Sequence, residues 1–258
     1  MADRYRFELL VPTRWQDGWA FARSCCQPDK YLAYLKQAQV LRGTAYLEDG
    51  AIRPCDLDKD GRLQMTGDEE GWHLLLVEND SDSVIGCVRY LLHANDVSFQ
   101  DLNISRCAAG TDLVTGPMIR SIVEADLDIA RRTGLGYVEV GGLVIMSRWR
   151  RTTAALHILA ASYALGQLWG GCLGICTATF RNGSASMIRR FSGSTSSSAF
   201  GPFTVYYDVR YNCLMELLRF KSEPAERYAG FVTDAKTELL QVQALRRDST
   251  PLTLPLVA

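Results

Sequence analysis

The feature that most constrains the fold is the segment 137–145, which is apolar on both faces except for Glu139. A strand of this kind lies inside a sheet that is covered on both sides. An arginine-rich turn, an apolar helical pattern over 152–169 and a second buried strand over 172–180 follow it. The order strand, helix, strand predicts a local parallel or splayed pair of strands, with space for a ligand at their carboxyl ends.

The rest of the chain has the element order of a mixed α/β protein. Strands are expected at 4–11, 72–78 and 83–92, and a hairpin at 203–207 and 213–220. Helices are expected at 15–39 with an interruption at Pro28, at 117–133, at 181–191 and from Pro224 to about Arg247. The acidic stretch 48–70 is expected to be a loop or an ordered substrate lid, and 193–199 a flexible loop. Residues 1–258 are expected to form one domain, with the helix and apolar tail at 224–258 packed on it.

Composition places the chain among ordinary globular proteins, with 47% hydrophobic and 22% charged residues. A net charge of −1 argues against a general nucleic-acid binder. None of the eight cysteines forms a CxxC pair, so we expect reduced thiols in a cytoplasmic protein. No window approaches the roughly 20 apolar residues of a membrane-spanning helix, and no signal-peptide pattern is present.

Glu139 is the only charged residue of its strand. Burying a carboxylate alone is costly, so it must be paired, neutral or functional. Desolvation is expected to raise its pKa toward the range in which a general base works. Two interpretations stay open: a base that removes a proton from an amine, and a structural carboxylate paired with an arginine. The strand by itself favours the structural one.

The turn after this strand carries Arg148, Arg150 and Arg151, followed by Thr152 and Thr153. A turn between a strand and a helix presents free backbone N–H groups, which suit a phosphate. The arginines add matching positive charge, and the threonines can cap the helix. The turn therefore predicts binding of the phosphates of an acyl carrier, with a solvated helix start as the alternative.

Two further charged features have functional and structural interpretations. Arg89 is a single charge in an apolar strand, where it could pair with Glu139, bind a substrate carboxylate or form another structural ion pair. The stretch 56–62 begins like an EF-hand calcium loop, but Gly67 stands where the closing Glu belongs, so an ordinary Asp/Gly turn is favoured. No metal site is expected.

Five short motifs, in their order along the chain, resemble the GNAT acyltransferase superfamily over most of the sequence. They are Leu41-Arg42 with Tyr46, Gly86-x-x-Arg89, Glu139 opening an apolar strand, Arg150-x-x-Thr153-x-Ala155, and Asn182-x-x-Ala185 with Gly193. Within the superfamily the chain is most similar to the acyl-homoserine-lactone synthases and N-acyl amino acid synthases. Three positions depart from the pattern: the usual arginine after Glu139 is Gly142, the usual first glycine of the pyrophosphate loop is Thr153, and the usual tyrosine acid is Arg189.

The resemblance implies an α/β (α+β sandwich) fold, with a mixed, mostly antiparallel, twisted sheet flanked by helices and splayed central strands. It implies catalytic roles for Glu139 and Arg89, and substrate contacts at Arg42, Tyr46 and Trp72. Backbone N–H groups in the 143–146 neighbourhood would stabilise the oxyanion. Residues implied in donor binding are Val144, Ile145, Met146, Arg148, Arg150, Arg151, Thr152, Thr153, Ala155 and Asn182.

The activity implied is transfer of an acyl group, expected to be long, from a thioester to the amine of a small molecule such as an amino acid. The co-substrate would be acyl-CoA or an acyl-carrier protein, without a metal. An arginine patch in this nearly neutral chain would suit either donor. An acetyl-CoA-dependent N-acetyltransferase and a catalytically silent binding protein remain alternatives, and either a monomer or a homodimer is open.

Overall fold

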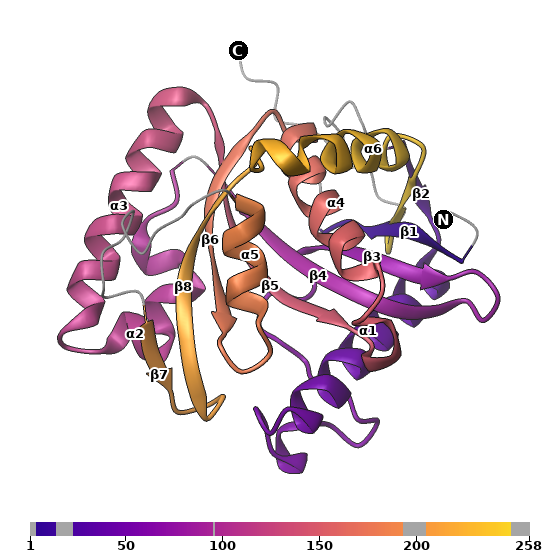
Figure 1. Ribbon diagram of the computed structural model, residues 1–258, viewed down its shortest axis with the longest axis horizontal. Helices are drawn as coiled ribbons and strands as arrows, with labels where there is room; N and C mark the ends of the chain where they lie inside the picture. Colours follow the sequence, from indigo (N-terminus) through magenta and orange to yellow (C-terminus); the bar gives the residue numbers. More distant parts are fainter. Residues whose placement is uncertain (1–3, 14–22, 95, 193–204, 249–258) are drawn as a thin grey trace.

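The computed structural model describes residues 4–13, 23–94, 96–192 and 205–248. Within them, nine strands form one sheet in the order β2-β9-β1-β3-β4-β5-β6-β8-β7 (Figure 1). The strands are β1 (Tyr5–Leu10), β2 (Arg23–Cys26), β3 (Trp72–Glu78), β4 (Ser83–His93), β5 (Gly136–Ile145), β6 (Cys172–Thr179), β7 (Val205–Asp208), β8 (Cys213–Lys221) and β9 (Gln243–Arg246). Most neighbours pair antiparallel, while β9 runs parallel to β1 and β2, and β5 parallel to β6.

Strands β5 and β6 separate halfway along their length. They pair from Gly136 opposite Cys172 as far as Val140 opposite Cys176. Beyond this point β5 continues beside β4 to Ile145, while β6 continues beside β8 to Thr179. The splayed strand pair expected from the sequence is therefore confirmed.

Helices cover both faces of the sheet (Figure 1). One face carries α4 (Ala154–Leu168), α5 (Ser184–Ser192) and α6 (Ala229–Leu239), whose apolar side chains form the largest core. On the other face α1 (Pro28–Glu48) packs over β3 and β4, while α3 (Thr115–Thr133) and the short α2 (Ala108–Thr111) pack over β5, β6 and β8. The splay thus opens between two helix-covered layers.

Two of the expected helices differ from the structure. Pro28 does not interrupt a helix but begins α1, since proline lacks only an N–H that the first helical turn leaves unpaired. The helix then runs on through the Arg42 and Tyr46 motif to Glu48. The last helix ends at Leu239 instead of about Arg247, and β9 then inserts between β1 and β2. The apolar tail and the 193–199 loop lie outside the described residues.

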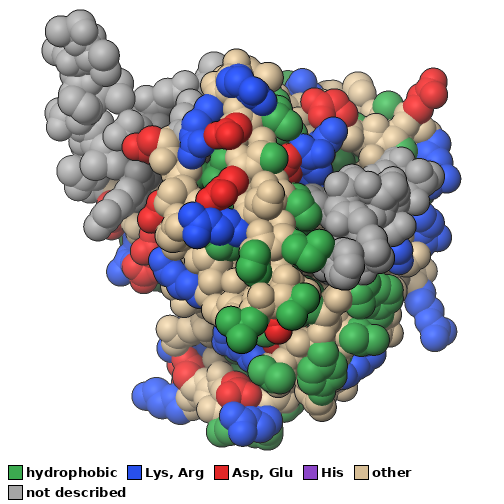
Figure 2. All heavy atoms as spheres, turned by 90° about the vertical axis from the view of Figure 1, so that its left-hand side faces the viewer, with side chains coloured by type: hydrophobic (Ala, Val, Ile, Leu, Met, Phe, Trp, Pro, Cys, Tyr) green, Lys and Arg blue, Asp and Glu red, His purple; other side chains and the backbone are tan. Residues whose placement is uncertain are grey.

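The side of the molecule formed by α3 and the β7–β8 hairpin is shown in Figure 2. Charges of both signs alternate along α3 as exposed pairs such as Arg120–Glu124. Beside them lie exposed apolar side chains of the α2–α3 connection and of the hairpin, where Leu113 is 92% and Val209 is 78% exposed.

Candidate active site

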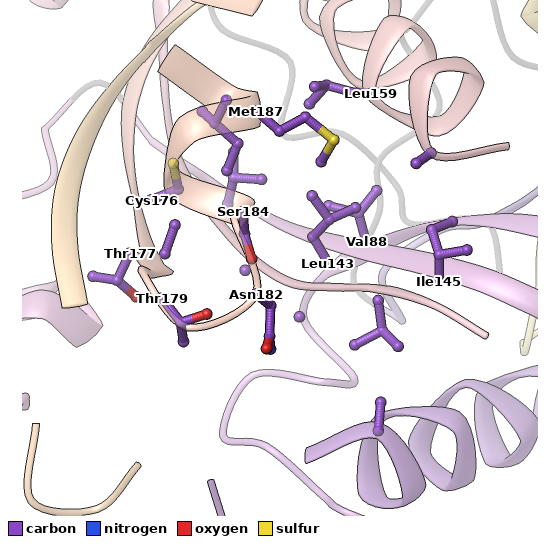
Figure 3. A pocket seen from close by; sticks show the side chains of 18 of the residues that line it. Val88, Leu143, Ile145, Leu159, Cys176, Thr177, Thr179, Asn182, Ser184 and Met187 are labelled. Atoms are coloured by element: carbon purple, nitrogen blue, oxygen red, sulfur yellow. The ribbon is translucent and has the colours of Figure 1, made fainter. Parts of the chain in front are cut away.

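A cavity of about 280 Å³ lies where β5 and β6 separate. Figure 3 shows Leu143 and Ile145 of β5 on one side of it and Cys176, Thr177 and Thr179 of β6 on the other. Toward α4 and α5 the lining is mainly apolar, with Leu159, Tyr163, Met187, Ile188 and Phe220. Toward α1 it becomes polar, so the cavity joins an apolar end to a polar end across the sheet.

Gly142 forms a bulge in β5 beside this cavity. The register between β4 and β5 shifts here, and Gly142 has a φ of +64°, which side chains other than glycine rarely tolerate. A Cβ added to Gly142 would come within 3.1 Å of Arg42 Cδ and 3.3 Å of Arg42 Nη1. The arginine that the family pattern places at this position would therefore meet the side chain of Arg42.

The polar end of the cavity is formed by the last turn of α1 and by the β7–β8 hairpin. Tyr46 and Asp49 line it, and Tyr46 packs edge-to-face on Tyr211 with 5.9 Å between the ring centroids. Asp49 Oδ2 accepts a hydrogen bond from Asn182 Nδ2 at 2.5 Å, and Asp49 Oδ1 lies 3.7 Å from Arg150 Nη1. Asp49 is the one acidic residue among the cavity-lining residues of the described chain.

Behind the bulge, Asp68 binds two buried arginines. Arg42 donates to both carboxylate oxygens of Asp68, at 3.0 and 2.5 Å, and Arg89 donates at 3.1 Å. Burial acts to raise the pKa of Asp68, but the hydrogen bond and charge of Arg42 outweigh it and hold the pKa below its ordinary value. Nearby, burial lowers the pKa of His73 to about 4, so this imidazole is neutral.

The ion pairs of Asp68 show how Arg89 and Arg42 are placed relative to the cavity. Arg89 forms a structural ion pair, but its partner is Asp68 and not Glu139. Arg42 is 1% exposed and supports the floor behind Gly142. Its guanidinium does not line the cavity, whereas Tyr46, predicted with it, does.

Glu139 is held by the last residue of β4 and by the segment between β4 and α2. Its carboxylate accepts hydrogen bonds from His93 Nε2 at 3.1 Å, from the backbone N–H and Nδ2 of Asn103 at 3.0 and 3.2 Å, and from the N–H of Ile104 at 2.9 Å. Burial acts to raise its pKa, but these hydrogen bonds outweigh it, and the pKa lies below the ordinary value. The expected upward shift is therefore wrong, because the sequence did not show four donors converging on one buried carboxylate.

The arginine-rich turn divides between the cavity and the surface. Arg150 lines the cavity and donates through Nε to the carbonyl of Ile145 at 3.0 Å. Arg148 points away and pairs with Glu78 at 2.8 Å, and Arg151 is exposed. Thr152 caps the turn, since its hydroxyl accepts the N–H of Ala154 at 3.1 Å. One of the helix-start N–H groups expected to be free for a phosphate is therefore already bonded.

The remaining predicted residues are distributed as follows. Val144, Ile145, Ala155 and Asn182 line the cavity. Met146 does not, and its N–H donates to the carbonyl of Ile85 at 2.8 Å, so it cannot serve as an oxyanion donor. Trp72 is 2% exposed, packs on Trp169 in the core and is not among the residues that line the cavity.

The acidic stretch 56–62 is folded by its own side chains. Asp58 Oδ1 accepts the backbone N–H groups of Asp60 and Arg62, both at 2.9 Å, and Oδ2 binds the Arg62 side chain at 2.7 Å. This is the Asp/Gly turn favoured from the sequence. The longer loop reaches the cavity through Ala51 and Met65.

The described residues contain neither a metal-binding cluster nor a membrane-spanning helix. No group of three or more His, Cys, Asp and Glu side chains is arranged to hold a metal ion. None of the helices in the same residues has the length and apolar character needed to cross a membrane.

Sequence reasoning missed the residues that make the cavity polar. Asp49 lies in the expected loop, but the preceding helix runs beyond residue 39 to Glu48, so its last turn carries Tyr46 and brings Asp49 to the cavity. Tyr211 sits in the hairpin turn, and only the folded chain brings it to Tyr46. Cys176 also lines the cavity, and burial raises its pKa to about 12, so its thiol is neutral and a poor nucleophile.

The splayed mixed sheet with helices on both faces defines the GNAT-like fold class, as the sequence predicted. No protein-family model and no curated protein matches the chain. Among solved structures it is similar to the CoA-dependent acyl-homoserine lactone synthase BjaI, with a TM-score of 0.50 and 12% identity over 95% of this chain and 93% of that one. At this identity the match shows a shared fold.

Two other solved structures are similar at lower TM-scores. FeeM, an N-acyl amino acid synthase from uncultured soil microbes, matches with a TM-score of 0.46 and 13% identity over 92% of this chain and 95% of that one. The AHL synthase LasI matches with a TM-score of 0.49 and 13% identity over 88% and 95%.

Proposed function

We propose that this protein is an N-acyltransferase that moves a long acyl group from a thioester to the amine of a small molecule. The observation that carries the proposal is the cavity through the splay, with its apolar end at α4 and α5 and its polar end at α1. An acyl chain would fill the apolar end, and an amine would reach the thioester carbonyl from the polar end. The GNAT-like fold and its likeness to an acyl-homoserine lactone synthase support this direction.

The donor would lie along the exposed edge of β5. Beyond Val140 this edge no longer pairs with β6, so the backbone groups of segment 141–145 that are not already bonded to β4 or Arg150 would meet a phosphopantetheine arm. Arg150 and Arg151, at the turn before α4, would bind the donor's phosphates or an acidic carrier protein. Both acyl-CoA and acyl-carrier protein fit this surface chemistry.

Glu139 stays the candidate base carried over from the resemblance. Its lowered pKa keeps it charged at neutral pH but reduces the driving force for taking a proton. Arg89, bound to Asp68, would act by positioning the floor behind the bulge. Loss of turnover in Glu139→Gln with the fold intact would support the base, and normal turnover would remove Glu139 from the mechanism.

The reaction is tested by release of free thiol. Purified protein is supplied with acyl-CoA donors from C2 to C16, with and without a panel of amino acids and simple amines. We expect thiol release only when an amine is present, and faster release with long donors. Release that does not depend on the amine contradicts the proposal, and a preference for acetyl-CoA would favour the acetyltransferase alternative.

The apolar end of the cavity argues against that alternative. An acetyl group would leave Leu159, Met187 and Phe220 without a ligand to contact. A long chain would instead bury apolar surface there, at roughly 25 cal/mol for each Å².

A further inference from the structure

We propose that Asp49 is the residue that binds the acceptor's ammonium group, which makes the acceptor a positively charged amine. This rests on the proposed acyl transfer and names the recognition that it requires. The sequence motifs indicate Glu139 as the acidic residue that meets the amine, whereas the lining of the cavity indicates Asp49.

Asp49 faces the cavity, and its carboxylate is held in place. Its side chain is 18% exposed, which leaves it reachable from the cavity but mostly shielded from bulk water. The hydrogen bond from Asn182 orients one oxygen at 2.5 Å. The other oxygen forms an ion pair with Arg150 Nη1 at 3.7 Å, which is beyond hydrogen-bond distance, so an incoming ammonium can bind this oxygen without breaking a hydrogen bond.

Aromatic rings complete the site. Tyr46 lies three residues before Asp49 on the same side of α1, and both line the cavity together with Tyr211. Aromatic faces attract cations, and a carboxylate forms charge-assisted hydrogen bonds with an ammonium. The two tyrosine rings also give an apolar surface for the rest of the acceptor.

Glu139 lacks these properties. Its oxygens already accept hydrogen bonds from three residues, and it is not among the cavity-lining residues of the described chain. The other buried carboxylate on this side, Asp68, is fully engaged by Arg42 and Arg89. Asp49 is the acidic group left to meet a cation at the splay.

The chemical step then balances simply. The ammonium loses one proton, which the candidate base Glu139 takes up and passes to solvent, and the free amine attacks the thioester carbonyl carbon. The C–N bond forms as the C–S bond breaks, and the thiolate takes the second nitrogen proton to leave as a thiol. Asp49 concentrates and orients the amine before this step.

The test uses the full chain, long-chain acyl-CoA, the most active amine of the panel and hydroxylamine, a nucleophile that is uncharged at pH 7.5. Asp49→Asn is expected to raise KM for the charged amine about ten-fold or more, and to leave KM for acyl-CoA unchanged. The ratio of kcat/KM for the amine to that for hydroxylamine should fall by a similar factor. A purely structural defect would lower both values together.

Glu48→Gln is the matched control, because it removes the preceding, exposed carboxylate of the same helix. It should leave the ratio unchanged, and Asp49→Glu should recover part of it. An unchanged ratio in Asp49→Asn would overturn the role of Asp49 and leave the proposed acyl transfer standing. Absence of turnover with every acceptor in the unmodified protein would overturn the proposed function and this inference with it.

Discussion

The packing of single residues at the β5 bulge explains why this chain lacks the arginine that the family pattern places after Glu139. Gly142 stands where the pattern has an arginine, with a positive φ and with Arg42 packed against its backbone. Arg42 is in turn fixed by Asp68. The Arg42 side chain of α1 therefore occupies the space that a side chain at position 142 of β5 would need.

Gly142→Ala tests this packing. The left-handed conformation should cost about 1–2 kcal/mol of unfolding free energy, and the approach to Arg42 adds to it. The matched control is Gly141→Ala, since a Cβ at Gly141 meets nothing within 4 Å. Urea denaturation compares the two variants, and equal stabilities would show that the bulge is not strained.

Glu139 should make stability depend on pH. Its folded-state pKa lies below the ordinary value of 4.5. Its contribution is therefore fully present above pH 4.5 and is lost as the pH falls through the folded-state pKa. Glu139→Gln should reduce stability at pH 7 by about 1.5–3 kcal/mol and flatten the acid limb of the stability profile. An acid limb that matches that of the unmodified protein would assign the dependence to other groups, Asp68 first.

At the scale of elements, the sequence predicted the strand pair and its splay but not what surrounds it. The apolar run of β5 and the helix after it are local patterns, so their order fixed the topology. The partners of Glu139 come from residues 35 to 46 positions away, and Asp68 joins two arginines from α1 and β4. Such pairings do not show in the periodicity of the sequence, which is why the expected pKa direction of Glu139 is wrong and the partner of Arg89 stayed open.

The end of α1 is a second feature that the sequence pattern does not predict. The helical pattern is expected to end at residue 39, but α1 continues to Glu48, and Tyr46 and the C-cap residue Asp49 both line the cavity. The chain after Leu239 looked helical but adds a strand to the sheet, since pairing with β1 and β2 outweighs its local preference. Both errors concern element ends, where tertiary contacts decide.

The cavity between β5 and β6 predicts a control of acyl length. Met187→Trp, on α5, should fill the apolar end and lower kcat/KM for the longest donors at least ten-fold, while short donors keep most of theirs. Met187→Leu conserves volume and should change little. Thiol release across the donor series measures this, and an equal loss at every chain length would place the acyl chain elsewhere.

At the scale of the whole molecule, a net charge of −1 hides a local concentration of arginines near the cavity. Arg150 and Arg151 precede α4, and Arg181 follows β6. A donor that carries phosphates or an acidic surface would be attracted to this side, and the attraction should weaken with added salt.

Arg151→Gln tests that attraction. Because Arg151 is exposed, we expect a moderate rise in KM for the donor, about three- to ten-fold, without a change in KM for the amine. Arg132→Gln, an exposed arginine at the end of α3, is the control and should leave both constants unchanged. Equal effects of the two substitutions would mean that overall charge, and not this turn, attracts the donor.

The central claim is tested most directly by mass spectrometry of the product made by the purified protein from a long-chain acyl-CoA and an amine. The account predicts an N-acyl amide that forms in a one-to-one ratio with free thiol, and whose acyl group shortens in Met187→Trp. Free fatty acid as the main product, or thiol release without any amide, would contradict it.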